Sequence, residues 1–242
     1  EEGIKFYKNY FKVGYSGLIG GMGLGTAMIS FIYSITNTSA AITLLCLAAM
    51  PFFTALLAFL FLREQITTNV WVSIFIATIG IVIMAIGNDE KNSVVGFIFG
   101  ILSSIGFSVF SVSLRWRKET PKFTTVAVAG LFCFVFATIM ILIKKQVFFS
   151  TSYNSALFSL HGVLVCFGLI LYSIGSKMIP AAELTLLSLT EVIGGIFWVW
   201  LPILGINEIP DTNTIIGGFF LFISLVYYSL IMRWNKRFIA LN

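Results

Sequence analysis

The chain has 242 residues, of which 58% are hydrophobic and only 10% are charged, and its mean hydropathy is +0.99. Soluble proteins carry about 25% charged residues, so this composition excludes a cytosolic enzyme, a disordered tail and a nucleic-acid-binding domain, although the net charge is +5. The three cysteines, Cys46, Cys133 and Cys166, lie inside apolar runs and predict no disulfide framework.

Eight apolar segments reach or approach the length of about 20 residues that a helix needs to cross a bilayer. They are too long for barrel strands, which are about ten residues long and alternate strictly. The predicted fold is therefore all-α, a polytopic transmembrane bundle of eight helices joined by short loops. In chain order the spans are Val13–Ile35, Thr38–Leu62, Val70–Gly87, Ser93–Leu114, Thr124–Ile143, Ala156–Ser176, Ile179–Ile206 and Asn213–Met232.

The basic residues predict the orientation, because Lys and Arg are enriched in short loops on the cytoplasmic side. With loops assigned alternately, Lys91, Lys144 and Lys145 fall outside and the other 12 of the 15 basic residues fall inside. Both ends of the chain are thus expected in the cytoplasm, most simply at a bacterial inner (plasma) membrane. The clusters Arg115–Lys122 and Arg233–Arg237 are interpreted as topology anchors that also contact lipid head groups.

Three short matches in the same order indicate an internal repeat. Tyr-Ser-Ile at 33–35 recurs at 172–174, Ala-Ala at 40–41 recurs at 181–182, and the Glu64 region recurs at Glu208. The first three spans therefore pair with the last three, which predicts two halves, residues 1–88 and 93–237, of opposite orientation. On this view the first half would start with a further hairpin of roughly 50–60 residues before Glu1. Inverted repeats are typical of secondary transporters that bind solute near the midplane.

Close packing of the first span is predicted from Gly17, Gly21 and Gly25, since small residues let helices approach each other in lipid. Pro51 lies in the middle of the second span, where it is expected to bend the helix.

Several motifs resemble the EamA-type carriers of the drug/metabolite transporter superfamily. In the second half they are the stretch 179–191, Trp-Val-Trp-Leu at 198–201, Asn-Glu-Ile-Pro at 207–210 and Ile-Gly-Gly at 216–218; in the first half they are the alanines at 40–41, Pro51 and Arg63-Glu64. The resemblance implies ten helices in two inverted five-helix repeats, of which helices 3–5 and 6–10 are present. It also implies transport of small metabolites, often amino acids or related amphipathic compounds. Glu191-Val192 stands where the family has Glu-Pro.

Glu191 is the strongest candidate for a substrate-binding residue. A charge at the centre of a membrane helix costs about 2.5–3.5 kcal/mol and usually faces a cavity or a partner. Ser188 and Trp198 share its helix face and would add a hydroxyl and a flat apolar wall. Glu191 would bind a substrate ammonium or exchange a proton; alternatively, it is a protonated residue that bonds to a neighbouring helix.

Other polar residues have two interpretations each. Tyr33 and Tyr172 occupy equivalent helix ends, where they line the pathway or lie at the membrane interface. Glu183 is expected to stabilise a helix N-terminus, and Glu64 to form a gate or to cap the next helix. His161 is the only histidine, and no metal or cofactor site is predicted.

The function predicted is a secondary transporter working by alternating access, coupled to protons or to the gradient of the solute itself. Its partners would be a small-molecule solute and membrane lipid, with no nucleic acid. A non-transporting sensor or assembly subunit would need a docking region, and a membrane enzyme would need an acid–base or metal constellation. The sequence leaves the solute, the direction, the coupling ion and the oligomeric state open.

Overall fold

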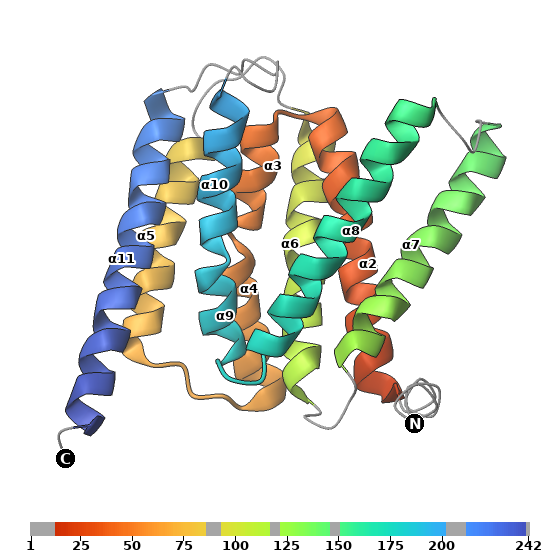
Figure 1. The fold of residues 1–242 in the computed structure, drawn as a ribbon. Coiled ribbons are helices and arrows are strands. Elements are labelled where there is room, and N and C mark those ends of the chain that lie inside the picture. Colours follow the sequence, from red (N-terminus) through yellow and green to blue (C-terminus); the bar gives the residue numbers. More distant parts are fainter. Residues whose placement is uncertain (1–12, 86–92, 117–121, 146–150, 202–211, 241–242) are drawn as a thin grey trace.

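The computed structural model describes residues 13–85, 93–116, 122–145, 151–201 and 212–240, and its regular elements in these ranges are all helices (Figure 1). Each of the eight predicted spans corresponds to one rod of the bundle, where a rod is a single helix or a series of consecutive helical segments in line. The polytopic helical fold is therefore confirmed. The elements are α2 (Gly14–Asn37), α3 (Ala40–Leu47), α4 (Met50–Leu57) with the π-helical turn η1 (Ala58–Leu62), α5 (Thr68–Ala85), α6 (Val94–Trp116), α7 (Lys122–Lys144), α8 (Ser152–Gly175), α9 (Ala181–Leu187), α10 (Leu189–Trp200) and α11 (Thr212–Ala240).

Six helical segments of the described chain are long and apolar enough to cross a membrane, and α5 and α11 add shorter apolar runs. The protein is therefore an integral membrane protein. The chain alternates between the two ends of the bundle (Figure 1). Arg63, Arg115 and Lys177 lie at one end, called here the Arg115 end, and Lys144 and Lys145 lie at the other, the Lys144 end. This is the separation of basic residues that the sequence predicted.

Two of the eight rods are broken helices. The second rod is interrupted at Ala48 and Ala49, between α3 and α4, and the seventh at Ser188, between α9 and α10. They run in opposite directions, so that α3 packs against α10 and α4 against α9 (Figure 1). Pro51 lies in the first turn of α4, just after the break, because proline fits the start of a helix, where its missing N–H is not needed.

Small residues bring α2 against its neighbours, as predicted. A Cβ atom at Gly21 would lie 2.5 Å from a methyl group of Val128 in α7, and one at Gly25 would lie 2.5 Å from the ring of Phe132. On the α6 side, a Cβ at Gly23 would lie 2.9 Å from the carbonyl oxygen of Gly106. The α2 backbone can approach α6 and α7 this closely only because these positions carry no side chain.

Two apolar cores meet inside the bundle. The larger one joins the two broken rods to α5 and α11, and the smaller one joins α2, α6, α7 and α8. Phe107 of α6 packs against both cores, and Tyr172 of α8 packs against the smaller one. The boundary between the cores therefore lies where α6, α8 and the broken rod α9–α10 come together.

Candidate functional site

Glu191 lies in the first turn of α10, directly after the break at Ser188. Its side chain is exposed, and no hydrogen bond or ion pair joins its carboxylate to any other residue in the described ranges. One turn further on, a Cβ atom at Gly194 would meet nothing within 4 Å. The carboxylate thus has space beside it and no partner among the residues that the structure describes, which at membrane depth favours a functional role.

Tyr172 of α8 lies close enough to Glu191 for the two side chains to interact electrostatically. Its hydroxyl shares a 2.6 Å hydrogen bond with the Ser111 hydroxyl of α6. Its ring is held edge-on by Phe107, with 5.1 Å between centroids, and stacks on Phe110 at 5.9 Å. Glu191 and Tyr172, which the sequence proposed from different spans, are thus within electrostatic range of each other.

Ser188 and Trp198 lie on the same broken rod as Glu191 but have different surroundings. The Ser188 hydroxyl donates a 2.7 Å hydrogen bond to the carbonyl oxygen of Thr185, one turn earlier in the chain. It therefore provides a hydrogen-bond donor for a backbone carbonyl group at the break. Trp198 is 55% exposed, and its ring meets Phe197 edge-on at 6.3 Å. It lies two turns beyond Glu191 and extends the same helix face toward the Lys144 end.

Tyr33 is separated from this site. It lies in the last turn of α2, at the Lys144 end, and stacks on Phe99 of α6 with 5.2 Å between ring centroids. Tyr172 lies near the opposite end, in the last turn of α8. The two tyrosines that the sequence analysis matched thus pack on aromatic rings of the same helix, α6, at different depths.

Glu183 occupies the first turn of α9, where the sequence placed it. Its carboxylate also accepts a 2.6 Å hydrogen bond from the hydroxyl of Tyr228 in α11, which is only 4% exposed. The sequence did not single out Tyr228. Its only signal is that it continues the buried face of α11 formed by Leu221, Ser224 and Leu225.

A row of serines on α6 was also missed. Ser104 and Ser108 donate their hydroxyls to the carbonyl oxygens of Cys46 and Met50, on either side of the break between α3 and α4, the second at 3.2 Å. Ser111, one turn further on, holds Tyr172. The spacing of four and three residues within an apolar span is the signal that could have identified this polar face.

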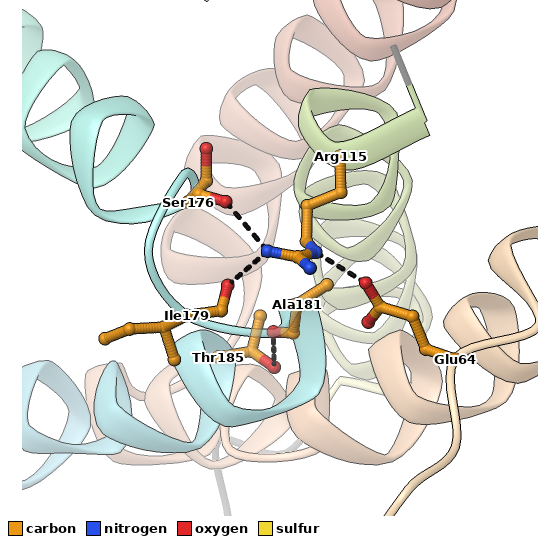
Figure 2. A network of polar contacts seen from close by, with 6 residues as sticks. All are labelled: Glu64, Arg115, Ser176, Ile179, Ala181 and Thr185. Atoms are coloured by element: carbon orange, nitrogen blue, oxygen red, sulfur yellow. Dashed lines mark hydrogen bonds and ion pairs between the residues drawn. The ribbon is translucent and has the colours of Figure 1, made fainter. Parts of the chain in front are cut away.

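Arg115, at the end of α6, connects three segments (Figure 2). Its Nε donates to Glu64 Oε1 at 2.5 Å, and its Nη1 donates to the carbonyl oxygens of Ser176 at 3.1 Å and Ile179 at 2.8 Å. Glu64 is therefore engaged by an arginine and not by a helix start, since α5 begins only at Thr68, and the capping interpretation of Glu64 is wrong. Its predicted counterpart, Glu208, lies outside the described residues, as do Arg117 and Lys118 of the first basic cluster.

Metal-binding groups do not gather in the part of the chain that the structure describes. No three His, Cys, Asp or Glu side chains lie together there in a way that could hold a metal ion. The polar groups that do converge are a carboxylate, a phenol and a serine hydroxyl. They can bind a solute through charge and hydrogen bonds.

Comparison with known proteins shows a similarity to transporters. A sequence model of the EamA-like transporter family matches residues 3–86, the part of the chain that contains α2 to α5. This match makes the first third of the chain similar to EamA-like transporters. Two proteins of Helicobacter pylori, from strains J99 and 26695, are both described as an uncharacterized transporter, and each is 30% identical to this chain over 118 residues. These matches cover 48% of this chain and 38% of each relative, so the chain spans well under two thirds of the relatives' length.

The fold of this chain has a counterpart among solved structures. A crystal structure described only as that of a protein matches it with a TM-score of 0.66 and 18% sequence identity. The match covers 89% of this chain and 76% of the other chain. At this identity the likeness concerns the fold alone.

Proposed function

We propose that this protein is a secondary transporter that moves a small amphipathic metabolite, such as an amino acid or a related amine, across the membrane by alternating access. The observation that carries the proposal is the Glu191 carboxylate, which is exposed at the break of a membrane rod and has no partner among the described residues. It lies within electrostatic range of Tyr172. A carboxylate without a partner at this depth is expensive unless a ligand or a proton compensates it.

The arrangement of the two broken rods supports the proposal. They run antiparallel and pack on each other through α3 with α10 and α4 with α9, as expected for two inverted halves, residues 1–88 and 93–237. Discontinuous helices at the junction of inverted repeats form the solute sites of many secondary transporters. Rocking of one half against the other would expose such a site to each side of the membrane in turn.

The chemistry around Glu191 supports a solute with both a polar and an apolar part. The carboxylate would bind an ammonium group or exchange a proton with it. The Ser111 hydroxyl donates to the carbonyl oxygen of Phe107 and so accepts from Tyr172, which leaves the Tyr172 oxygen to accept a hydrogen bond from the solute. The rings of Phe107 and Tyr172 would provide an apolar and cation-attracting wall. Ser188 and Trp198 would extend the site along the rod, whereas Tyr33 would face the pathway only at the Lys144 end.

The distribution of charge supports an orientation. Arg63, Arg115 and Lys177 lie at one end, so we place the Arg115 end in the cytoplasm and the protein in a bacterial inner membrane. Membrane lipid would then cover the exposed apolar faces of α7 and α8, including Phe134, Leu142 and Phe158.

The experiment is uptake into proteoliposomes that contain the purified protein, measured with a panel of labelled amino acids and amines at several values of pH. Glu191→Gln is expected to abolish uptake of the solute that the wild-type protein carries, or to remove its pH dependence, while the protein still inserts. Glu183→Gln is the matched control, because it removes a carboxylate from the same rod but keeps a hydrogen-bond acceptor for Tyr228. Undiminished, pH-independent uptake by the Glu191 variant would refute the proposed role.

A further inference from the structure

The guanidinium of Arg115 joins the two proposed halves of the molecule. Glu64, which follows η1, belongs to the first half, and the carbonyl groups of Ser176 and Ile179 belong to the connection between α8 and α9 in the second (Figure 2). All three accept from the same side chain. When the halves separate at this end of the bundle, at least one of these bonds must break.

Behind these bonds, small side chains close the Arg115 end. Ala58 of η1, Val112 of α6 and Ala181 of α9 form a buried cluster, and Thr185, one turn further along α9, is fully buried. Figure 2 shows Ala181 and Thr185 next to Arg115, on the helix that starts after Ile179. The end that carries Arg115 is therefore packed closed in this structure.

The connection between α2 and α3 and the connection between α8 and α9 occupy matching places in the two proposed halves and are called here the two joints. They are held by different contacts. In the first half, the hydroxyls of Ser34 and Thr43 share a buried hydrogen bond of 2.9 Å that ties α2 to α3. In the second half, Ser173 and Leu184 occupy the matching positions. Leucine offers no hydrogen bond, and the buried hydroxyl of Ser173 has no partner. The α8–α9 joint therefore lacks the internal bond of its counterpart and is held from outside, by Arg115.

We infer that Arg115 is a latch, which holds the α8–α9 joint against Glu64 in this closed state and releases it once in each transport cycle. The inference rests on the proposed transport function and assigns to this joint the motion that opens the Arg115 end. The first-half joint, with its own hydroxyl pair, moves as a unit with α2 and α3.

The exposure and chemistry of the latch suit repeated opening. The side chains of Arg115 and Glu64 are 18% and 21% exposed, so water can reach both charges as they part, and no fully buried charge is left behind. The guanidinium presents several N–H groups in a rigid fork, which lets it hold the carboxylate and two carbonyl oxygens at once. A lysine ammonium is a single point charge on a flexible stem and cannot span the same three acceptors in this geometry.

The first test measures access to a cysteine placed behind the latch. In the full chain with Cys46, Cys133 and Cys166 replaced by alanine, Thr185→Cys is treated with a membrane-impermeant maleimide in sealed vesicles of either orientation. Labelling from the Arg115 side should be slow, and Glu64→Gln or Arg115→Lys should accelerate it about tenfold, the factor expected when a charge-assisted hydrogen bond is lost. Arg63→Gln, which removes an exposed neighbouring charge, is the control and should leave the rate unchanged.

Equal labelling rates in all these variants, with uptake intact, would overturn the latch and leave the transport function standing. Faster labelling in a protein that carries none of the solutes tested would instead overturn the proposed function, and with it the place of the latch in a transport cycle. The two failures are distinguishable because labelling requires no solute.

A second test does not depend on weakening the closed state. The double variant Glu64→Cys/Arg115→Cys, in the same cysteine-free background, is bridged with a short bifunctional thiosulfonate reagent. Bridging should stop uptake, and reduction should restore it. Uptake that continues at the same rate in the bridged protein would overturn the inference, because the joint would then not need to open.

Discussion

Tyr228 donates a 2.6 Å hydrogen bond to Glu183, which ties α11 to the first turn of α9. The tyrosine is buried and the carboxylate partly buried, so neither group is well compensated by water if the bond is lost. This contact is distinct from the candidate site, although Glu183 and Glu191 lie on the same broken rod.

Tyr228→Phe should therefore destabilise the protein without removing apolar packing. The expected decrease in the free energy of unfolding is about 1–3 kcal/mol, because a buried acceptor loses its donor. Thermal unfolding in detergent micelles measures it as a lower Tm. Tyr227→Phe is the control: the Tyr227 hydroxyl makes no hydrogen bond in the described structure, so its loss should leave Tm in place. Equal Tm values for the two variants would contradict the role given to Tyr228.

Alanine substitutions at Ser34 and Ser173, the two serines that the proposed repeat matches, should affect the stability of the protein differently. Ser34→Ala removes the bond to Thr43 and should lower stability by about 0.5–1.5 kcal/mol. Ser173→Ala removes a buried hydroxyl that has no partner, so it should leave stability unchanged or raise it by a similar amount. Chemical denaturation of both variants in the same micelle gives the comparison, and a loss of stability at Ser173 equal to that at Ser34 would show that the two joints are alike.

Tyr172→Phe tests the hydroxyl of the candidate site while it keeps the ring contacts with Phe107 and Phe110. Loss of the bond to Ser111 and of a hydrogen bond offered to the solute should reduce uptake about 3- to 10-fold, mainly through a higher KM, which corresponds to roughly 0.5–1.5 kcal/mol. Tyr153→Phe, at the exposed start of the same helix, should transport at the wild-type rate. A Tyr172 variant with unchanged kinetics would remove the hydroxyl from the site.

The glycines of α2 and α7 should respond differently to alanine. At Gly21 the added methyl group would lie 2.5 Å from Val128 and 3.0 Å from the carbonyl oxygen of Thr125, so Gly21→Ala should separate α2 from α7 and cost about 1–3 kcal/mol. At Gly130 the methyl group would meet nothing within 4 Å, and Gly130→Ala should stabilise α7 by about 0.5–1 kcal/mol, because glycine is a poorer helix former. Monomer stability in micelles, followed by circular dichroism, separates the two cases.

The site was only partly predictable from the sequence. Glu191 stands out as a carboxylate inside an apolar span, and Tyr172 stands out through the repeat with Tyr33. That these two lie within electrostatic range of each other, whereas Tyr33 lies at the other end of the bundle, follows from the directions in which α2 and α8 run. Ser111 was not predicted: its spacing from Ser104 and Ser108 marks a polar helix face, but its partner, Tyr172, depends on how α6 and α8 pack.

The sequence indicated the break in the second rod but not the break in the seventh. Pro51 indicated a disturbance in the second span, and the structure places it in the first turn after the break. The break at Ser188 contains no proline or glycine. It lies opposite the first break, where α3 meets α10 and α4 meets α9, and no local signal announced it.

The sequence alone determined the number of rods, their order and the distribution of basic residues between the two ends. Burial of a segment in lipid depends on how many consecutive apolar residues it has, and this number can be read directly from the sequence. The partners of Arg115, Tyr228, Ser104 and Ser108 were decided only by the tertiary structure. Hydrogen bonds between helices act over about 3 Å, so they depend on the rotation and tilt of each rod, and these are set when all the rods pack together.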